Sequence, residues 1–251
     1  MFASTVNIVY IKVDAAGRTN DSECSEETSL NAKKKTMKKT AVRSKIEGSY
    51  HHGNLKTSLK QAALRLVRKK GARGFSINEA SRLAGVTVAA PYRHFADKDA
   101  LLAEIASDGW ELLDRELRDA ASEVEDIREK LVEIGMTYVR FSKVHLDYFE
   151  VMFYAGLDKS KYPNLESSGR RAFAVLSELA EQLEQTPQLA QQRAVTCWAL
   201  VHGLAALTVE GALSSMMSED PEFEHLRPLF EQFLSQPCRS ADRATMPRQS
   251  I

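Results

Sequence analysis

The sequence predicts an all-α protein, and three observations support this prediction. Apolar residues recur at spacings of three and four along most of the chain between Asn54 and Leu234, which is the period of an amphipathic helix. Residues that cap helices, such as Ser76 and Asp97, stand where several of these segments begin. No segment shows a convincing alternation of apolar and polar residues, which is the pattern of a half-buried strand.

The first predicted helices are short. One carries lysines and arginines on the face opposite its apolar residues and ends at Gly71. The sequence SINE at 76–79 is a capping box that opens a second helix, which ends at Gly85. A third helical stub follows. Pro91 fits this stub if it begins near Val88, because the missing proline N–H then falls in the first turn.

Longer helices are predicted for the rest of the chain. Asp97 caps the first of them, and Thr186 and Asp220 each precede a proline at a first helical position. The helix that begins at Pro187 is apolar on more than one side, so we expect it and the last helix to pair with their counterparts as a four-helix bundle. The expected bounds are about 98–121, 127–145, 148–154, 165–184, 187–215 and 221–234.

Charge is distributed unevenly along a chain whose formal net charge is zero. Between Lys33 and Arg73 there are fourteen lysines and arginines against one acidic residue, whereas between Leu101 and Leu234 there are twelve against twenty-four. A basic end on an acidic body indicates that one end meets a polyanion. The alternative is that a lysine-rich tail merely keeps the chain in solution.

Several functional classes find little support in the sequence. The three cysteines are scattered and lack metal-ligand spacing, which favours a reducing cytoplasm over disulfides or a zinc site: Cys24, Cys197 and Cys238. His51 and His52 have no third ligand at a plausible spacing. No apolar run is long enough for a membrane span, and Lys12 cuts short the apolar residues near the start, so no signal peptide is expected. No nucleophile motif or glycine-rich phosphate loop indicates an enzyme.

The stretch GVTVAAPYRHFADKDAL, at 85–101, is too short to fold as an independent helix. Three short helices with a glycine turn between the second and third are the layout of a helix-turn-helix unit, whose third helix enters the major groove of DNA. Small residues that permit a close approach to base edges come first: Thr87, Val88, Ala89 and Ala90. Residues able to bond to phosphates follow: Tyr92, His94 and Lys98.

Residues 50–102 resemble the DNA-binding domain of the TetR family of bacterial transcriptional regulators. The matching features are the Gly-Val turn at 85–86, the Tyr-x-His-Phe sequence at 92–95 and the Asp-Lys that follows. A second stretch, WALVHG at 198–203, resembles the Trp-x-x-x-His-Gly feature of one subgroup's effector domain. The resemblance implies a homodimer that binds a palindromic operator, usually as a repressor released by a small ligand.

The same resemblance implies which residues contact DNA. Phosphate contacts fall to Tyr92, His94 and Lys98. The residues expected to contact bases, together with their neighbours, lie at the starts of the second and third helices: Ser76, Asn78, Thr87, Val88, Ala89, Ala90 and Arg93. Because this set is poor in hydrogen-bonding groups, we expect DNA shape and phosphate contacts to supply much of the specificity. The basic arm at 33–45 is expected to add phosphate or minor-groove contacts and to steepen the salt dependence of binding.

Aromatic and polar residues that can line an effector cavity recur in the C-terminal helices. The candidates are Trp110, Tyr138, Phe141, His145, Phe149, Met152, Phe173, Trp198 and His202. Each can equally be an ordinary core residue. His202 is interpreted either as a buried histidine bonded to a backbone carbonyl or as a polar group of the pocket. The acidic composition of this region disfavours an anionic ligand, although a buried pocket can have its own local charge.

The predicted organisation has four parts: a basic tail at 1–48, a DNA-binding domain at 49–98, an effector and dimerisation domain at 99–235 and a C-terminal tail at 236–251. Met37 opens MKKTAVRSK, which is typical of a bacterial N-terminus, so residues 1–36 are hypothesised to be an over-long gene prediction. The expected partners are operator DNA, a second copy of the chain and a small-molecule effector, with no cofactor, metal or membrane and a cytoplasmic location.

The expected mechanism is a tilt of the helix at 98–121 when a ligand enters between the helices at 127–145 and 165–184. Two alternatives remain open. One is an architectural DNA binder of the same fold without a ligand, whose effector domain packs without a cavity. The other is an enzyme in which the helix-turn-helix is incidental.

Overall fold

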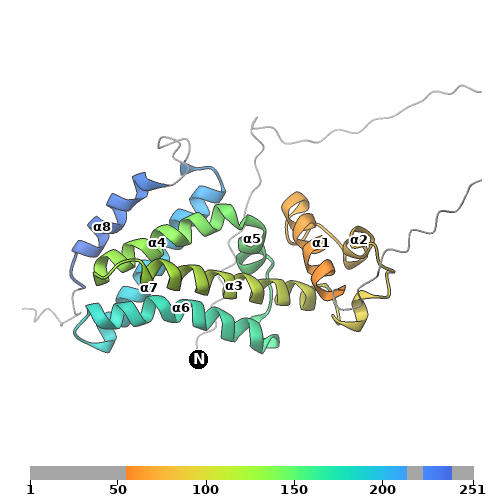
Figure 1. Cartoon of the computed structure of the whole chain (residues 1–251), viewed down its shortest axis with the longest axis horizontal. Helices are drawn as coiled ribbons and strands as arrows, with labels where there is room; N and C mark the ends of the chain where they lie inside the picture. The colour runs from red at the N-terminus through yellow and green to blue at the C-terminus, as the bar shows by residue number, and fades with distance from the viewer. Residues whose placement is uncertain (1–54, 214–222, 239–251) are drawn as a thin grey trace, which may run out of the picture. The chain divides into compact units, whose positions relative to one another are not determined.

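The structure is a computed structural model, and it describes residues 55–213 and 223–238. Two units are distinguished along the chain, Met1–Ser49 and Tyr50–Ile251, and all of the described residues belong to the second. These residues form eight α-helices joined by turns and short 3-10 helices, and no strand occurs among them (Figure 1). The all-α prediction is therefore confirmed. The predicted basic arm at 33–45, the hypothesised extension 1–36, His51 and His52 lie outside the described residues.

The first three elements are α1 (Leu55–Lys70), α2 (Ile77–Leu83) and a 3-10 helix (Pro91–Arg93). The predicted capping box is present: the Ser76 hydroxyl accepts a hydrogen bond from the Glu79 backbone N–H, and the Glu79 carboxylate accepts one from the Ser76 N–H at 2.8 Å. Gly85 ends α2 with a φ of 72°. Its N–H donates to the Arg82 carbonyl and that of Val86 to the Ser81 carbonyl, which closes the turn as a Schellman motif.

The third helical stub is shorter and more tightly wound than expected. The sequence predicts a helix from about Val88, but residues 88–90 form a turn and only Pro91–Arg93 are helical, as a 3-10 turn. Pro91 begins this turn, where its missing N–H needs no partner, and its carbonyl accepts hydrogen bonds from the His94 N–H at 2.8 Å and the Phe95 N–H at 2.9 Å. Pro91 and Phe95 are buried on one side of this stub.

The longest helix, α3 (Lys98–Ser122), begins directly after the stub and runs along the C-terminal helices (Figure 1). The Asp97 carboxylate caps it by accepting a hydrogen bond from the Ala100 N–H at 2.7 Å. Leu101, Ile105 and Leu113 are almost completely buried along its length. The helix therefore joins α1, α2 and the stub to the C-terminal helices through a single continuous backbone.

Replacing Asp97 by alanine is expected to lower the free energy of unfolding by about 1 kcal/mol, because the first turn of α3 loses its side-chain cap. Urea unfolding followed by circular dichroism measures this change. Asp97→Asn is the matched control, because asparagine caps helices about as well as aspartate. An equal loss in both variants would contradict a capping role.

The remaining helices are α4 (Ile127–Val144), α5 (Leu146–Tyr154), α6 (Pro163–Leu183), α7 (Pro187–Val209) and α8 (Arg227–Ser235). Short 3-10 helices at Lys159–Lys161 and Glu224–Leu226 precede α6 and α8. α7 is shorter than the expected 187–215. It ends because Gly211 adopts a φ of 75°, and the Ala212 N–H donates to the Leu207 carbonyl in a second Schellman motif.

The last helix also begins later than the expected position 221. Asp220 and Pro221 lie outside the described residues, and Phe223 has a φ of 60°. A right-handed helix cannot continue through that conformation. Pro228, which has no N–H to donate, then lies in the first turn of α8, where no partner is needed.

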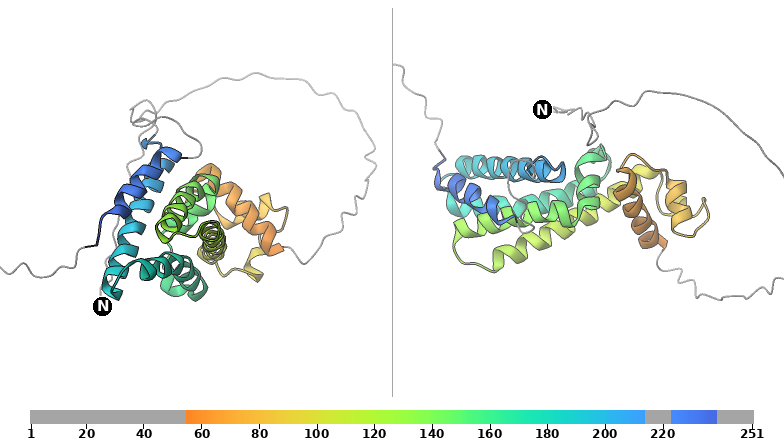
Figure 2. Two further views of the ribbon diagram at one scale, coloured as in Figure 1. Left: turned by 60° about the vertical axis from the view of Figure 1, so that its left-hand side comes forward. Right: turned by 90° about the horizontal axis from the view of Figure 1, so that it is seen from above.

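α3 and α6 lie side by side and run in the same direction. Two ion pairs fix their register, Glu111 to Arg171 at 3.1 Å and Arg118 to Glu178 at 3.5 Å, because both pairs are separated by seven residues along each helix. α4 packs against α7, and α8 covers α4 through Arg227, which pairs with Glu129 and Glu133 (Figure 2). Within the described ranges, no helix has the length and apolar composition needed to cross a membrane.

Candidate DNA-binding surface and effector cavity

The third helical stub presents its polar side chains outward. Tyr92 is 54% exposed, and Arg93 and His94 are also exposed. The residues before them are small and accessible: Thr87, Val88 and Ala89 are exposed and Ala90 is half-buried. Pro91 and Phe95 are both buried, Phe95 as part of the hydrophobic core, so the three helical residues are anchored by the apolar side of the stub.

Two of the predicted DNA-contacting residues already have partners within the protein. The Ser76 hydroxyl is engaged in the capping box, while its neighbour Asn78 is exposed. The Lys98 ammonium donates to the Arg73 carbonyl at 3.2 Å and lies 4.4 Å from the centroid of the Phe75 ring. Partial burial lowers the pKa of Lys98 below its ordinary value.

Contacts between the DNA-binding helices and the effector region involve α5 as well as α3. The Arg68 guanidinium at the end of α1 pairs with Asp147 at 3.1 Å. The Glu150 carboxylate accepts a hydrogen bond from the Ala72 N–H at 3.3 Å. From α1 to α3, Lys56 pairs with Glu104 at 2.8 Å. The end of α1 is thus attached to α5 through the polar face of that short helix.

The opposite face of α5 is aromatic. The Phe149 ring lies 6.2 Å from that of Tyr138, and the Phe153 ring lies 5.2 Å from that of Trp110, measured between centroids. Phe153 also contacts the His202 ring at 4.6 Å. α5 therefore touches the DNA-binding helices on one side and residues of the effector region on the other.

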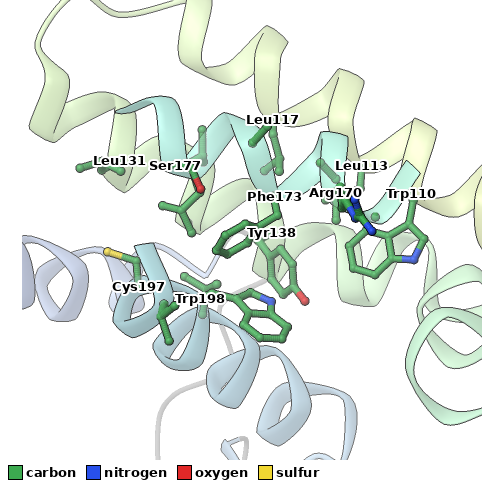
Figure 3. Close-up of a pocket in the computed structure, with 18 of the residues that line it drawn as sticks. Trp110, Leu113, Leu117, Leu131, Tyr138, Arg170, Phe173, Ser177, Cys197 and Trp198 are labelled. Carbon is green, nitrogen blue, oxygen red and sulfur yellow. The ribbon is translucent and has the colours of Figure 1, made fainter. Parts of the chain in front are cut away.

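A cavity of about 600 Å³ lies between α3, α4, α6 and α7 (Figure 3). Its walls are mainly apolar and aromatic, as is usual for small-molecule sites. Trp110 and Arg170 stand at one end, Phe173, Tyr138 and Trp198 in the middle, and Leu131 and Cys197 at the other end (Figure 3). Burial raises the pKa of the Cys197 thiol to about 11, which keeps it protonated.

Four of the nine predicted ligand-binding candidates line this cavity: Trp110, Tyr138, Phe173 and Trp198. The other five lie elsewhere. Phe141 and Phe149 are buried in the core, and Met152 packs where Gly109 leaves room for its sulfur. The His145 Nε2 lies 3.0 Å from the Glu116 carboxylate, between α4 and α3. His202 is not among the lining residues but contacts two of them, Tyr138 and Trp198.

His202 is bonded to a side chain, and not to the backbone carbonyl that one interpretation of the sequence anticipated. Its Nδ1 shares a hydrogen bond of 3.0 Å with the Tyr138 hydroxyl. Burial lowers the pKa of His202, and the positive charge of Lys159 lowers it further, so the imidazole is neutral. Burial also raises the pKa of Tyr138. The pair therefore presents a neutral polar group to the cavity.

Residues that sequence reasoning missed lie on α6 and on the 3-10 turn before it: Lys159, Glu166, Gly169, Arg170 and Ser177. The charged ones carry no sequence signal, because they are indistinguishable from ordinary surface residues. Gly169 lies beside the Trp110 ring, and a Cβ there would be in ordinary contact with it at 3.6 Å, so the glycine itself indicates no special requirement. In the part of the chain that the structure describes, no cluster of three or more His, Cys, Asp or Glu residues is placed to hold a metal ion.

Comparison with known proteins identifies both halves of this arrangement. Residues 59–105 match the model of the bacterial regulatory proteins of the tetR family. Residues 131–233 match the tetracyclin repressor-like C-terminal domain, and the two matches together cover more than half of the chain. The chain belongs to the TetR family. Members of this family are DNA-binding regulators of transcription and not enzymes, which removes the enzymatic alternative.

Solved TetR-type structures share the fold. A protein of unknown function from Rhodococcus sp. RHA1 is 26% identical, with a TM-score of 0.64, over 77% of this chain and 100% of that one. The TetR-family regulator PfmR from Thermus thermophilus is 18% identical, with a TM-score of 0.55, over 70% and 97% of the two chains. A transcriptional regulator from Pseudomonas aeruginosa PAO1 is 21% identical, with a TM-score of 0.54, over 72% and 88%. No curated protein matches the sequence.

Proposed function

We propose that this TetR-family regulator is a cytoplasmic homodimeric repressor, which binds a palindromic operator and is released from it by a small molecule. The observation that carries the proposal is the cavity of about 600 Å³ whose wall includes α3, the helix that continues directly from the DNA-binding stub. A purely architectural DNA binder has no use for such a cavity. The cavity therefore favours a ligand-responsive regulator.

The exposed residues of the stub and of the start of α2 are the proposed DNA contacts. Tyr92, His94 and Lys98 bind phosphates. The groups that face bases are Ser76, Asn78, Thr87, Val88, Ala89, Ala90 and Arg93. Lys98 must exchange its bond to the Arg73 carbonyl for a phosphate oxygen, which is a favourable exchange because a charged acceptor binds an ammonium more strongly than a neutral carbonyl does.

The exposed face of α7 is the proposed centre of the dimer interface. Val195, Ala199, Gly203 and Leu207 follow one another at intervals of four residues and are all exposed. A Cβ added at Gly203 meets nothing within 4 Å, so a second helix can approach this point closely. Leu229 extends the exposed apolar surface onto α8. In the proposed twofold dimer, the two stubs must lie about 34 Å apart to meet both half-sites.

Replacing Gly203 by arginine is expected to weaken the dimer about tenfold, because a charged side chain then has to be desolvated at the closest point of the proposed interface. Sedimentation equilibrium measures the dissociation constant. Gln182→Arg, at an exposed position on α6, is the matched control. A wild-type protein that sediments as a monomer, or a Gly203→Arg variant that dimerises normally, would contradict the proposed interface.

Release follows from the two connections between the cavity and the DNA-binding helices. A ligand between α4 and α6 displaces Trp110, Leu113 and Leu117 of α3, which tilts that helix and with it the stub. The aromatic face of α5 contacts Trp110 and Tyr138 and transmits the same displacement to α1 through Asp147 and Glu150. A few kcal/mol of differential affinity between the two states is enough for release. Ligand binding that leaves operator affinity unchanged would refute this mechanism.

A further inference from the structure

The end of the cavity beside the start of α6 carries an unbalanced positive charge. The 3-10 turn before α6 and the first half of α6 carry four cationic residues, Lys159, Lys161, Arg170 and Arg171, of which Lys159 and Arg170 line the cavity. Three have a carboxylate partner: Lys161 pairs with Asp158 at 3.7 Å, Arg171 with Glu111 at 3.1 Å, and Arg170 with Glu166. Lys159 pairs with no carboxylate in the described ranges. One net positive charge is therefore left at a residue that lines the cavity.

Lys159 lies against the wall of the cavity. Its ammonium is 5.7 Å from the centroid of the Trp110 ring, a cation–π contact that holds it at this end. Its field reaches inward, since it contributes to the lowered pKa of His202. Desolvation also lowers the pKa of Lys159 itself. An anion bound beside it would offset that desolvation.

A second polar group at the same end also lacks a partner. The Trp110 side chain is 7% exposed, and its indole N–H has no hydrogen-bond acceptor among the described residues. This nitrogen is covered by protein atoms, so Trp110 offers a bound molecule the face of its ring and not its N–H. Much of the remaining lining is apolar and includes Leu113, Leu117, Leu131, Ile134, Leu176 and Val201. From Glu166 to Ser177 this lining extends roughly 16 Å along α6.

We infer that the effector is an elongated amphipathic monoanion, whose apolar body lies along α6 and whose carboxylate-like head meets the Lys159 ammonium beside the Trp110 ring. This inference rests on the proposed function of the cavity as the effector site. The acidic composition of the C-terminal region predicts the opposite preference, but the charge nearest to the ligand decides, because salt at about 0.1 M screens the surface charges over about 10 Å.

Decyl compounds with three head groups test the inference on the full chain. Decanoate, decan-1-ol and decylamine share an apolar body and differ in charge. Both tryptophans of the chain line the cavity, so intrinsic fluorescence reports binding, at concentrations below those that form micelles. We expect decanoate to bind about tenfold more tightly than decan-1-ol and more tightly still than decylamine, in line with one charge-assisted hydrogen bond.

Three variants separate charge from folding. Lys159→Gln is expected to weaken decanoate binding about tenfold and to leave decan-1-ol binding unchanged. Lys159→Arg keeps the charge and is expected to retain decanoate binding. Lys161→Gln, in the same turn but paired with Asp158, is the matched control and is expected to change neither affinity.

The other possible results distinguish a failure of the inference from a failure of the proposed function. Equal affinities for decanoate and decan-1-ol, with Lys159→Gln affecting neither, would overturn the anionic preference and leave the proposed regulator intact. Preferred decanoate binding that leaves operator affinity unchanged would support the inference and contradict ligand release. If none of the three compounds bound, both the inference and the cavity's role as a site for amphipathic effectors would be overturned.

Discussion

Replacing Tyr92 and Lys98 together by alanine is expected to abolish operator binding, with a loss of affinity of about a thousandfold. Each substitution removes a proposed phosphate contact, and a homodimer loses each contact twice. Four hydrogen bonds at about 1 kcal/mol each amount to roughly that factor. The exposure of Tyr92 makes a direct effect on folding small, because its side chain is largely in solvent.

Selection from randomised duplex DNA at two salt concentrations, followed by sequencing, measures this effect. The wild-type protein is expected to recover an inverted repeat, and the double variant none. Lys143→Ala, an exposed lysine on α4, is the control for loss of a positive charge elsewhere. Because Lys98 also bonds the Arg73 carbonyl, Tyr92→Ala alone is tested beside the double variant. Sequence-blind binding that collapses with salt would favour the architectural alternative, and no binding by the wild type would contradict the assignment of residues 85–101.

Replacing Arg193 by methionine is expected to lower the free energy of unfolding by about 3–5 kcal/mol. The Arg193 side chain is 4% exposed and pairs with Glu184, which is 11% exposed, at 2.8 Å. A second bond of 2.8 Å joins its guanidinium to the Gln236 carbonyl beyond α8. This one side chain therefore holds together the end of α6, the start of α7 and the segment after α8. Its removal leaves a buried carboxylate without its partner.

Chemical denaturation of four variants, namely Arg193→Met, Glu184→Gln, the double variant and Arg118→Met, tests this prediction. Glu184→Gln combined with Arg193→Met is expected to cost less than the sum of the single changes, because the double variant no longer buries an unpaired charge. Arg118→Met is the matched control. Arg118 has two carboxylate partners, Asp114 and Glu178, but its side chain is 47% exposed, so the expected cost of its removal is below about 1 kcal/mol. Similar losses for Arg118→Met and Arg193→Met would show that burial does not set the strength of the pair.

The local signals of the sequence predict the helices well where a side chain acts on its own backbone. The Ser76–Glu79 capping box and the Asp97 cap are both present at the positions where they were expected. Each depends on residues within one turn of each other, so it does not depend on the rest of the fold. Helix ends that are not set by a capping side chain within one turn were predicted less well. The position 221 start of the last helix is wrong because Phe223 adopts a left-handed conformation, which no capping rule forecasts for phenylalanine.

The cavity shows what only the tertiary structure decided. The sequence placed Phe141 and Tyr138 on the same helical stripe, yet only Tyr138 lines the cavity, because a helical period identifies the buried face and not the neighbour that the face meets. The positive charge at the Lys159 end of the cavity could not be predicted from the sequence either. Lys159 is one of many lysines in the sequence, and it stands out only because three neighbouring cations pair with carboxylates and it does not. The sequence by itself determined which segments are helical and where their caps lie, because these features are local, whereas packing between distant helices decided the cavity and its charge.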